Sequence, residues 1–300
     1  ANLDEVSTLL RYCGINGPVT LNLEAGVYSP VTFYPITGSS FGNVVTLTSL
    51  SGNPASVTIL TTGSTSPITL QGVANMYIRN ITLDASTSPT VALRLAGLIS
   101  NVDVYNCVLK AMPRSSSNTT ACVYYNNASG TGYKLDRVRF RKNSMDGGYY
   151  NMYLYYTGSG SGTNMGEVVI DSNTLTNAYY YGIYSYYYGY YPSISYNTIT
   201  LANGASTSYG MYLYYYQTIE NLIGNKVNVT ATSTAYGIYT YYYSNYNTTY
   251  NSNGPGMIAN NDIYVRGGTS GAYGLYTYQN SRWNIYHNSI YATNGATNYA

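Results

Sequence analysis

The stretch Tyr209-Gly210-Met211-Tyr212 is one of four copies of a tetrapeptide that decides the fold of this chain. The other copies are Tyr181-Gly182-Ile183-Tyr184, Tyr236-Gly237-Ile238-Tyr239 and Tyr273-Gly274-Leu275-Tyr276. The copies begin 28, 27 and 37 residues apart, which lies mostly within the range of solenoid repeats. Because the spacing is unequal, we expect insertions to lie in loops while every repeat keeps the same cross-section.

A second motif recurs once per repeat: an asparagine followed by an apolar residue, either directly or after one other residue. It occurs at Asn80, Asn106, Asn143, Asn173, Asn197, Asn225, Asn261 and Asn288. Asparagine tolerates a left-handed backbone and bonds its own neighbouring backbone, so each copy predicts a sharp bend between two strands. Stacked bends predict an asparagine ladder at Asn143, Asn173, Asn197, Asn225, Asn261 and Asn288, whereas the apolar spacing before Asn80 and Asn106 differs.

The tyrosine segment alternates in a way that indicates a strand. Ile183, Met211, Ile238 and Leu275 fall on one side, and the tyrosine that follows each of them falls on the other. A period of two is typical of strands and not of helices. Three short strands per repeat predict an all-β fold, a right-handed, single-stranded parallel β-helix of about nine to ten coils.

The first residues predict a cap for this β-helix. Leu3, Val6, Leu9 and Leu10 fall at helical spacing before Gly14, and a short helix there would cover the open strand edges of the first coil. We therefore expect one β-helix domain over 1–300, with a cap at 1–14, less regular coils at 15–120 and tyrosine-rich coils at 121–300. The last residues match the start of another coil, so we expect the array to continue or stack beyond residue 300.

Composition narrows the function classes. Only 8% of the residues are charged, the formal net charge is +2, and there are 42 tyrosines and 30 glycines. A charge this small supplies no field to gather nucleic acid, and no apolar run is long enough to insert in a membrane. No signal-peptide pattern begins the chain, so we expect any signal to have been removed already.

The segment Cys13-Gly14-Ile15-Asn16-Gly17-Pro18-Val19-Thr20-Leu21-Asn22-Leu23-Glu24-Ala25-Gly26-Val27-Tyr28, followed by Ile36-Thr37-Gly38 and Val45-Thr46-Leu47, carries a family resemblance. Together with the asparagine repeats behind it, this opening resembles the secreted right-handed parallel β-helix surface proteins of Bacteroidota. The resemblance implies export to the bacterial cell surface through a secretion system that reads a separate C-terminal sorting domain. The density of tyrosine departs from that family.

Residues that could carry catalysis are few and scattered. Of the eleven acids, only Asp136, Glu167 and Asp171 are expected on neighbouring coils of one face, and we expect Asp171 to form a salt bridge with Arg141. Glycosidic chemistry usually needs two facing carboxylates. The only histidine, His287, is interpreted as a surface residue, and Arg137, Arg139 and Arg141 as a solvated strand face. We predict no catalytic residue, no metal site and no cofactor, and hence no enzyme.

The three cysteines, Cys13, Cys107 and Cys122, form no CxxC pair. We interpret them as small buried apolar residues. The alternative is a disulfide between Cys107 and Cys122 that bridges adjacent turns of the solenoid.

Of the 42 tyrosines, 37 lie from Tyr124 onward, and alternation should align them in outward columns. One column is predicted at Tyr153, Tyr184, Tyr212, Tyr239 and Tyr276, and another at Tyr155, Tyr186, Tyr214, Tyr241 and Tyr278. Such stacking could serve stability alone. A bare aromatic face would also be adhesive, so we predict an extracellular structural or adhesive protein of the cell surface that contacts copies of itself, in an oligomer or filament, or a cell-surface glycan or polymer. The alternative function is a polysaccharide-binding or polysaccharide-degrading lyase or hydrolase with this face as its substrate track.

Overall fold

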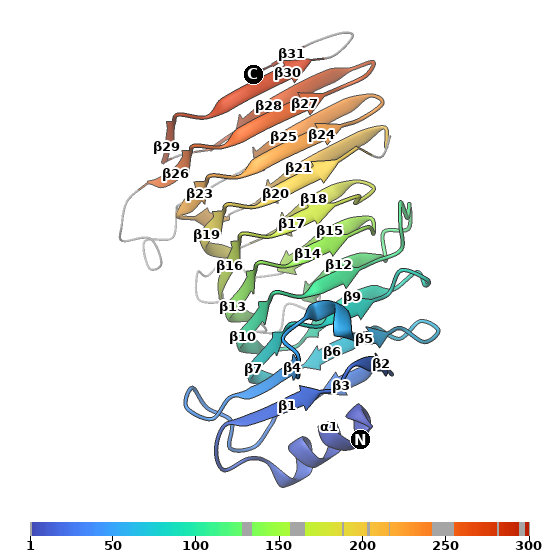
Figure 1. Cartoon of the computed structure of the whole chain (residues 1–300). Helices are drawn as coiled ribbons and strands as arrows, with labels where there is room; N and C mark the ends of the chain where they lie inside the picture. The colour runs from blue at the N-terminus through green and yellow to red at the C-terminus, as the bar shows by residue number, and fades with distance from the viewer. Residues whose placement is uncertain are drawn as a thin grey trace.

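Three parallel sheets run the length of the molecule, and each coil contributes one strand to each sheet (Figure 1). This computed structural model describes residues 2–127, 134–156, 166–187, 189–202, 205–215, 217–241, 255–280, 282–293 and 298–299. Ten strands follow one another along every sheet, so ten coils stack along one axis. The predicted all-β parallel β-helix with three strands per coil and an N-terminal helix is confirmed.

Sheet A contains β1 (Val19–Leu23), β4 (Val45–Ser49), β7 (Ala74–Arg79), β10 (Ile99–Tyr105), β13 (Leu135–Arg141), β16 (Glu167–Asp171), β19 (Tyr190–Ser195), β23 (Asn221–Ile223), β26 (Gly256–Ala259) and β29 (Trp283–Tyr286), with β22 (Thr218–Ile219) beside β19. Sheet B contains β2 (Gly26–Tyr28), β5 (Val57–Leu60), β8 (Thr82–Asp84), β11 (Val108–Lys110), β14 (Ser144–Asp146), β17 (Thr174–Thr176), β20 (Thr198–Leu201), β24 (Lys226–Thr230), β27 (Asp262–Arg266) and β30 (Ser289–Thr293). Sheet C contains β3 (Val31–Phe33), β6 (Ile68–Gln71), β9 (Val91–Ala96), β12 (Ala121–Asn127), β15 (Tyr150–Tyr156), β18 (Tyr181–Tyr186), β21 (Thr207–Tyr214), β25 (Thr234–Tyr241), β28 (Gly271–Tyr278) and β31 (Asn298–Tyr299). A 3-10 helix, η1 (Pro54–Ser56), precedes β5.

Parallel pairing in register builds the core from columns of like residues. In sheet A one such column is fully buried and consists of Phe140, Ile170, Ile194, Leu222 and Ile258. In sheet B the corresponding column consists of Leu175, Ile199, Val227 and Ile263. Each coil therefore adds its apolar residues to columns that continue in the coils above and below, which is how a solenoid gains stability.

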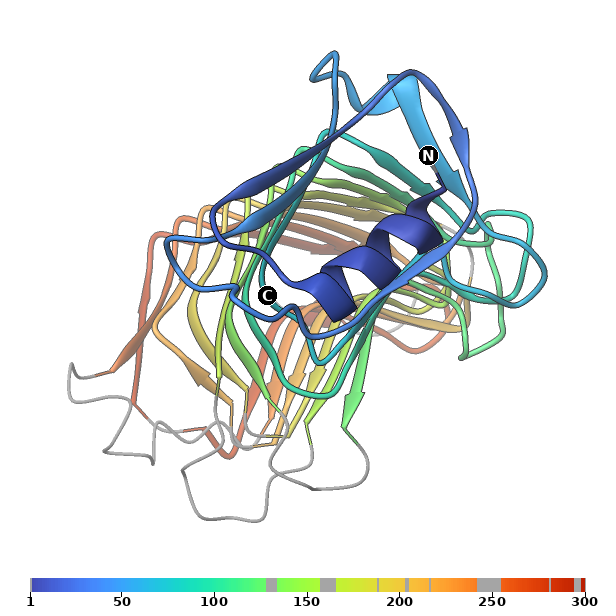
Figure 2. The same ribbon diagram turned by 90° about the horizontal axis from the view of Figure 1, so that it is seen from below.

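Helix α1 (Leu3–Cys13) lies across the N-terminal end of the coil, as Figure 2 shows. The Asn2 side chain caps its start by accepting a hydrogen bond from Asp4 N, and Gly14 ends it with a φ of 67°. Leu3 and Leu10 are buried, and Ser7 Oγ donates to Thr32 O of β3 at 2.6 Å. Leu9, predicted to share the buried stripe, is instead 60% exposed, because the stripe runs through Leu3, Ser7 and Leu10 and Leu9 points about 100° away from Leu10. Among the described residues, no helix has the length and apolar character required to cross a bilayer.

The six predicted ladder asparagines form a continuous chain of hydrogen bonds, in which all but the half-buried Asn288 are buried. The side-chain Oδ1 of Asn197 accepts from both the backbone N and the Nδ2 of Asn173, each at 3.0 Å. The Asn197 Nδ2 donates to Ile170 O and to Asn225 Oδ1 at 3.0 Å. The same pattern joins the remaining members, Asn143, Asn173, Asn225, Asn261 and Asn288.

We predicted that these asparagines adopt the left-handed backbone conformation at each bend, and this prediction is wrong. The residue with positive φ is the one before each ladder asparagine, namely Lys142, Ser172, Tyr196, Gly224, Asn260 and His287. Asn80 and Asn106 do take the left-handed position, with φ of 54° and 50°, and this explains their different spacing. The ladder positions are therefore selected for an inward amide that bonds adjacent coils, and not for backbone tolerance.

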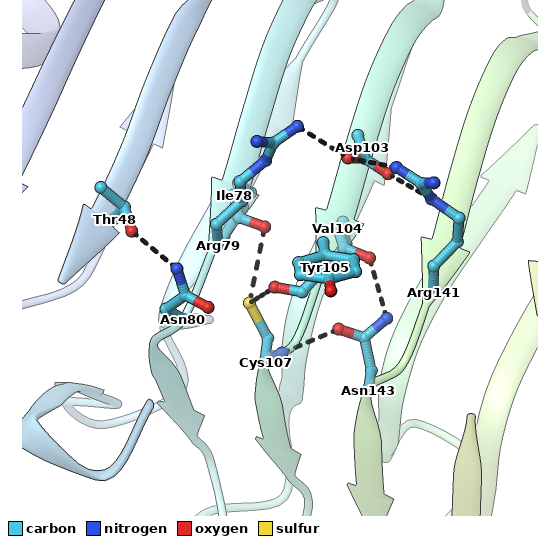
Figure 3. Close-up of polar contacts among 10 residues, drawn as sticks. All are labelled: Thr48, Ile78, Arg79, Asn80, Asp103, Val104, Tyr105, Cys107, Arg141 and Asn143. Carbon is cyan, nitrogen blue, oxygen red and sulfur yellow. Dashed lines mark hydrogen bonds and ion pairs between the residues drawn. The ribbon is translucent and has the colours of Figure 1, made fainter. Parts of the chain in front are cut away.

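In the coil that contains Asn106, the ladder position belongs to Cys107. Its backbone N donates to Asn143 Oδ1 at 3.0 Å, and its Sγ lies 3.5 Å from Ile78 O (Figure 3). Cys13, also interpreted as buried, is exposed, so that prediction is wrong for this residue. Cys122 lies in β12 of sheet C, and the thiols of Cys107 and Cys122 are both buried and free. The alternative of a Cys107–Cys122 disulfide is wrong, because the two side chains belong to different parts of the cross-section. Burial raises the pKa of each thiol to about 12.

Replacing one ladder asparagine should lower the free energy of unfolding by more than the loss of so small a side chain suggests. Asn197→Ala removes the acceptor of Asn173 N and the donor to Ile170 O inside the protein, and should lower the free energy of unfolding by about 2 to 4 kcal/mol. Guanidinium denaturation followed by circular dichroism measures the change. The matched control is Asn118→Ala in an exposed turn, which should stay within about 0.5 kcal/mol. Equal effects at both positions would refute the ladder's role.

Candidate functional site

The outer side of sheet C carries three columns of tyrosine, which we call the tyrosine face. The first column consists of Tyr150, Tyr181, Tyr209, Tyr236 and Tyr273. The second consists of Tyr124, Tyr153, Tyr184, Tyr212, Tyr239 and Tyr276, and the third of Tyr155, Tyr186, Tyr214, Tyr241 and Tyr278. The second and third columns contain all ten tyrosines predicted for this site.

The rings within each column stack on one another. In all three columns, the centroids of successive rings are 4.6 to 5.3 Å apart and the ring planes lie within 15° of parallel. This spacing follows the distance between hydrogen-bonded strands, about 4.8 Å. The stacking predicted from the sequence is therefore a direct consequence of the register of sheet C.

Contacts across the columns join them into one surface. Rings of the first and second columns meet edge to face, at 5.0 Å and 72° for Tyr181 and Tyr184 and at 5.0 Å and 77° for Tyr209 and Tyr212. Rings of the second and third columns are parallel, as for Tyr212 and Tyr214 at 5.2 Å and 10°. Both arrangements are favourable for aromatic quadrupoles, each contributing about 0.5 to 1.5 kcal/mol beyond burial.

The first column was not predicted, because strict alternation places Tyr181 on the same side as Ile183. The structure instead turns both Gly182 and Ile183 inward, so that Tyr181 and Tyr184 both face outward. Glycine permits this bend: a Cβ on Gly210 would lie 2.4 Å from Val227 Cγ1 and 2.6 Å from Gly237 O. The signal was present in the motif itself, as the constant glycine between two tyrosines.

The stacking determines which part of each ring meets solvent. A ring inside a column has its two faces covered by the rings above and below, as Tyr212 lies between Tyr184 and Tyr239. These three residues are half-buried, and their hydroxyl groups are not among the buried unpaired atoms of the described residues. The tyrosine face therefore presents ring edges and hydroxyl groups, in rows that repeat with the coils.

Electrostatics keep the face neutral. Burial, and secondarily the neighbouring phenols, raise the pKa of Tyr181, Tyr184 and Tyr212 well above the ordinary value. A phenolate inside a column would lose solvation and repel any ionised neighbour. The face is thus an uncharged surface whose hydroxyl groups can donate as well as accept hydrogen bonds.

The predicted salt bridge between Arg141 and Asp171 is wrong, because Arg141 turns toward the preceding coil. Its Nε and Nη2 donate to the buried carboxylate of Asp103 at 3.0 and 2.9 Å, and Arg79 Nη2 approaches the same carboxylate at 3.2 Å (Figure 3). Two guanidinium groups compensate the burial of Asp103, whose strand β10 lies between the strands β7 and β13 that carry them. This cluster is a link between coils.

The other residues considered as catalytic candidates do not lie together. Asp136 pairs with Arg137 at 2.7 Å, and Asp171 accepts from Ser172 Oγ at 3.3 Å. His287 is exposed and takes the left-handed position before Asn288. Within the described residues, no three His, Cys, Asp or Glu side chains gather as a metal site would require.

Gly210→Ala should disturb the face without removing a tyrosine. The added methyl would meet Val227 and the Gly237 carbonyl, and should lower the free energy of unfolding by about 1 to 3 kcal/mol. The control is Gly17→Ala, where no atom lies within 4 Å of the added carbon and little change is expected. Thermal unfolding of the two variants measures the difference, and equal stability would show that the bend at Gly210 is not constrained.

Alkali should unfold the protein cooperatively. Because the pKa of the column tyrosines is raised in the folded state, the stability they contribute is fully present below pH about 10 and is lost as the pH rises further. Phenolate absorbance of the native protein should lag behind that of the chain in guanidinium, and then rise together with the loss of β circular dichroism. Superimposable titrations in the two solvents would contradict the buried columns.

Comparison with known proteins supplies no further guide to this site. No protein-family model matches the chain, and no curated protein sequence matches it. The function of the tyrosine face therefore has to be argued from its own geometry.

Proposed function

We propose that this protein is an extracellular structural or adhesive β-helix of the bacterial cell surface, and that it holds its partner through the tyrosine face. The observation that carries the proposal is the continuous array of ring edges and hydroxyl groups over the coils from β12 to β28. Phenol groups of this kind suit protein interfaces, because each combines apolar area with a hydrogen-bonding tip. The placement at the cell surface rests on the family resemblance of the opening segment.

A second copy of the chain fits this face better than a sugar polymer does. Sugar rings stack their apolar side on an open aromatic face, but here the faces inside the columns are covered by neighbouring rings. Ring edges, in contrast, can pack edge to face against the rings of an identical surface, as they do between Tyr209 and Tyr212. A surface that is complementary to itself favours a symmetric pair, or a lateral assembly if both sides of the molecule take part.

In this proposal the protein is structural or adhesive and not an enzyme. Of the carboxylates considered for glycosidic chemistry, Asp136 pairs with Arg137 and Asp171 accepts a hydrogen bond from Ser172. The covered ring faces also argue against the tyrosine face as a substrate track for a lyase or hydrolase.

The decisive variant replaces four central tyrosines, Tyr212, Tyr214, Tyr239 and Tyr241, by serine. Self-association, measured by analytical ultracentrifugation over a concentration series, should weaken by about tenfold or more, because the centre of an interface contributes most of its binding energy. The variant should keep a β-rich circular dichroism spectrum, since the asparagine ladder and the apolar columns are untouched.

Two comparisons separate adhesion from stability. Replacing the same four residues by phenylalanine keeps the stacking and removes the hydroxyl groups, while Tyr196→Ser with Tyr286→Ser removes two exposed rings of other regions. Association should be retained by the Tyr196 and Tyr286 variant. If the wild type stays monomeric at every concentration, or if the fourfold serine variant associates as well as the wild type, the columns serve only the stability of the coil.

A further inference from the structure

A shallow depression lies on the outer side of sheet B, away from the tyrosine face. It has a volume of about 180 Å³ and is formed by three consecutive strands, β20, β24 and β27. Six outward side chains surround it, and register aligns them in two rows: Thr198, Lys226 and Asp262 in one, and Thr200, Asn228 and Tyr264 in the other. The buried residues Ile199 and Val227 lie beneath.

Tyr264 supplies an open aromatic wall. Its ring stacks on Tyr291 of the next coil, with centroids 5.3 Å apart and planes within 12°. Tyr291 thus covers the face of the Tyr264 ring on the C-terminal side. The opposite face is directed toward Asn228, which precedes Tyr264 in the same row. Because asparagine is much smaller than tyrosine, the stack stops there and the ring keeps one face uncovered. This is the arrangement that the interior of the tyrosine face lacks.

The polar groups around this wall are free to bind. Within the described part of the chain, the side chains of Thr198, Thr200, Lys226, Asn228 and Asp262 form no hydrogen bond or ion pair with one another or with other residues. Other positions of the same sheet are engaged: Thr176 Oγ1, one coil before Thr200, donates to Asp146 Oδ1 at 2.7 Å. The depression therefore combines donors and acceptors that no internal partner uses.

We propose that this depression is a binding subsite for one neutral sugar residue of a glycan. A sugar ring has an apolar side that fits the open face of Tyr264, and hydroxyl groups that can donate to Asp262 and accept from Lys226. Asn228 and the two threonines can do both. The charges of Lys226 and Asp262 cancel, so the site favours an uncharged ligand over a sulfated or uronic one. The site does not rest on the proposed function, because none of its residues belongs to the tyrosine face.

An immobilised array of neutral oligosaccharides, from one to six residues long, probes the site directly, and titration calorimetry then gives the dissociation constant of any sugar retained. Two variants should each weaken binding by about tenfold or more. Tyr264→Ser removes the wall, and Asn228→Tyr fills the depression by extending the stack of Tyr264 and Tyr291. The matched control, Tyr286→Ser, removes a somewhat more exposed tyrosine from sheet A and should bind as the wild type does.

Retention of a neutral sugar that both variants lose and the control keeps would establish the subsite. The proposal is overturned if no sugar on the array is retained by a protein with a native circular dichroism spectrum. It is equally overturned if Asn228→Tyr binds with unchanged affinity. Failure of the fourfold tyrosine variant to reduce association would leave these results unaffected, since that variant alters sheet C alone.

Discussion

Every side-chain feature of this molecule depends on one constraint: the coils pair in parallel and in register, so a residue type at one position of the cross-section stacks on itself in the next coil. Hydrogen bonding between strands sets the repeat at about 4.8 Å. At that distance an amide can bond another amide and an aromatic ring can lie against another ring. A change in register of one residue would exchange the inner and outer sides and destroy both arrangements.

The constraint acts differently on the inside and on the outside. Inside, stacking satisfies the polar residues of the asparagine ladder, where the Asn197 amide finds partners on both neighbouring coils. Outside, stacking removes aromatic ring faces from solvent, so the tyrosine face exposes less aromatic area than its number of tyrosines suggests. On sheet B the stack of Tyr264 and Tyr291 ends at Asn228, and there an aromatic face is left open. The interior of a long column and the open end of a short stack are thus chemically distinct surfaces.

Much of the fold was predictable because the residue pattern of one coil recurs in every repeat of a solenoid. The recurrence of Tyr-Gly-apolar-Tyr and of the bend asparagines located the strands of the second half of the chain. It also located the second and third tyrosine columns, which follow from strict alternation of inward and outward residues. The first column, with Tyr181 and Tyr209, was missed because alternation fails at the glycine, where two successive residues face inward. Arg141 was assigned the wrong partner because sequence spacing cannot tell whether a long side chain turns to the preceding or the following coil.

The sequence by itself determined the β-helix, the asparagine ladder and an aromatic face, since these follow from periodicity and from residue types that recur at fixed spacing. Only the tertiary structure decided that the ring faces in the columns are covered, that Cys107 lies at the bend before β11 while Cys122 lies in sheet C, and that one depression is surrounded by Tyr264, Lys226, Asn228 and Asp262. The physical reason is that periodicity assigns a side chain to the inside or the outside of one coil. Its rotamer and its partner depend on the residues of the neighbouring coils, which are about 24 to 37 positions away in a chain of repeats.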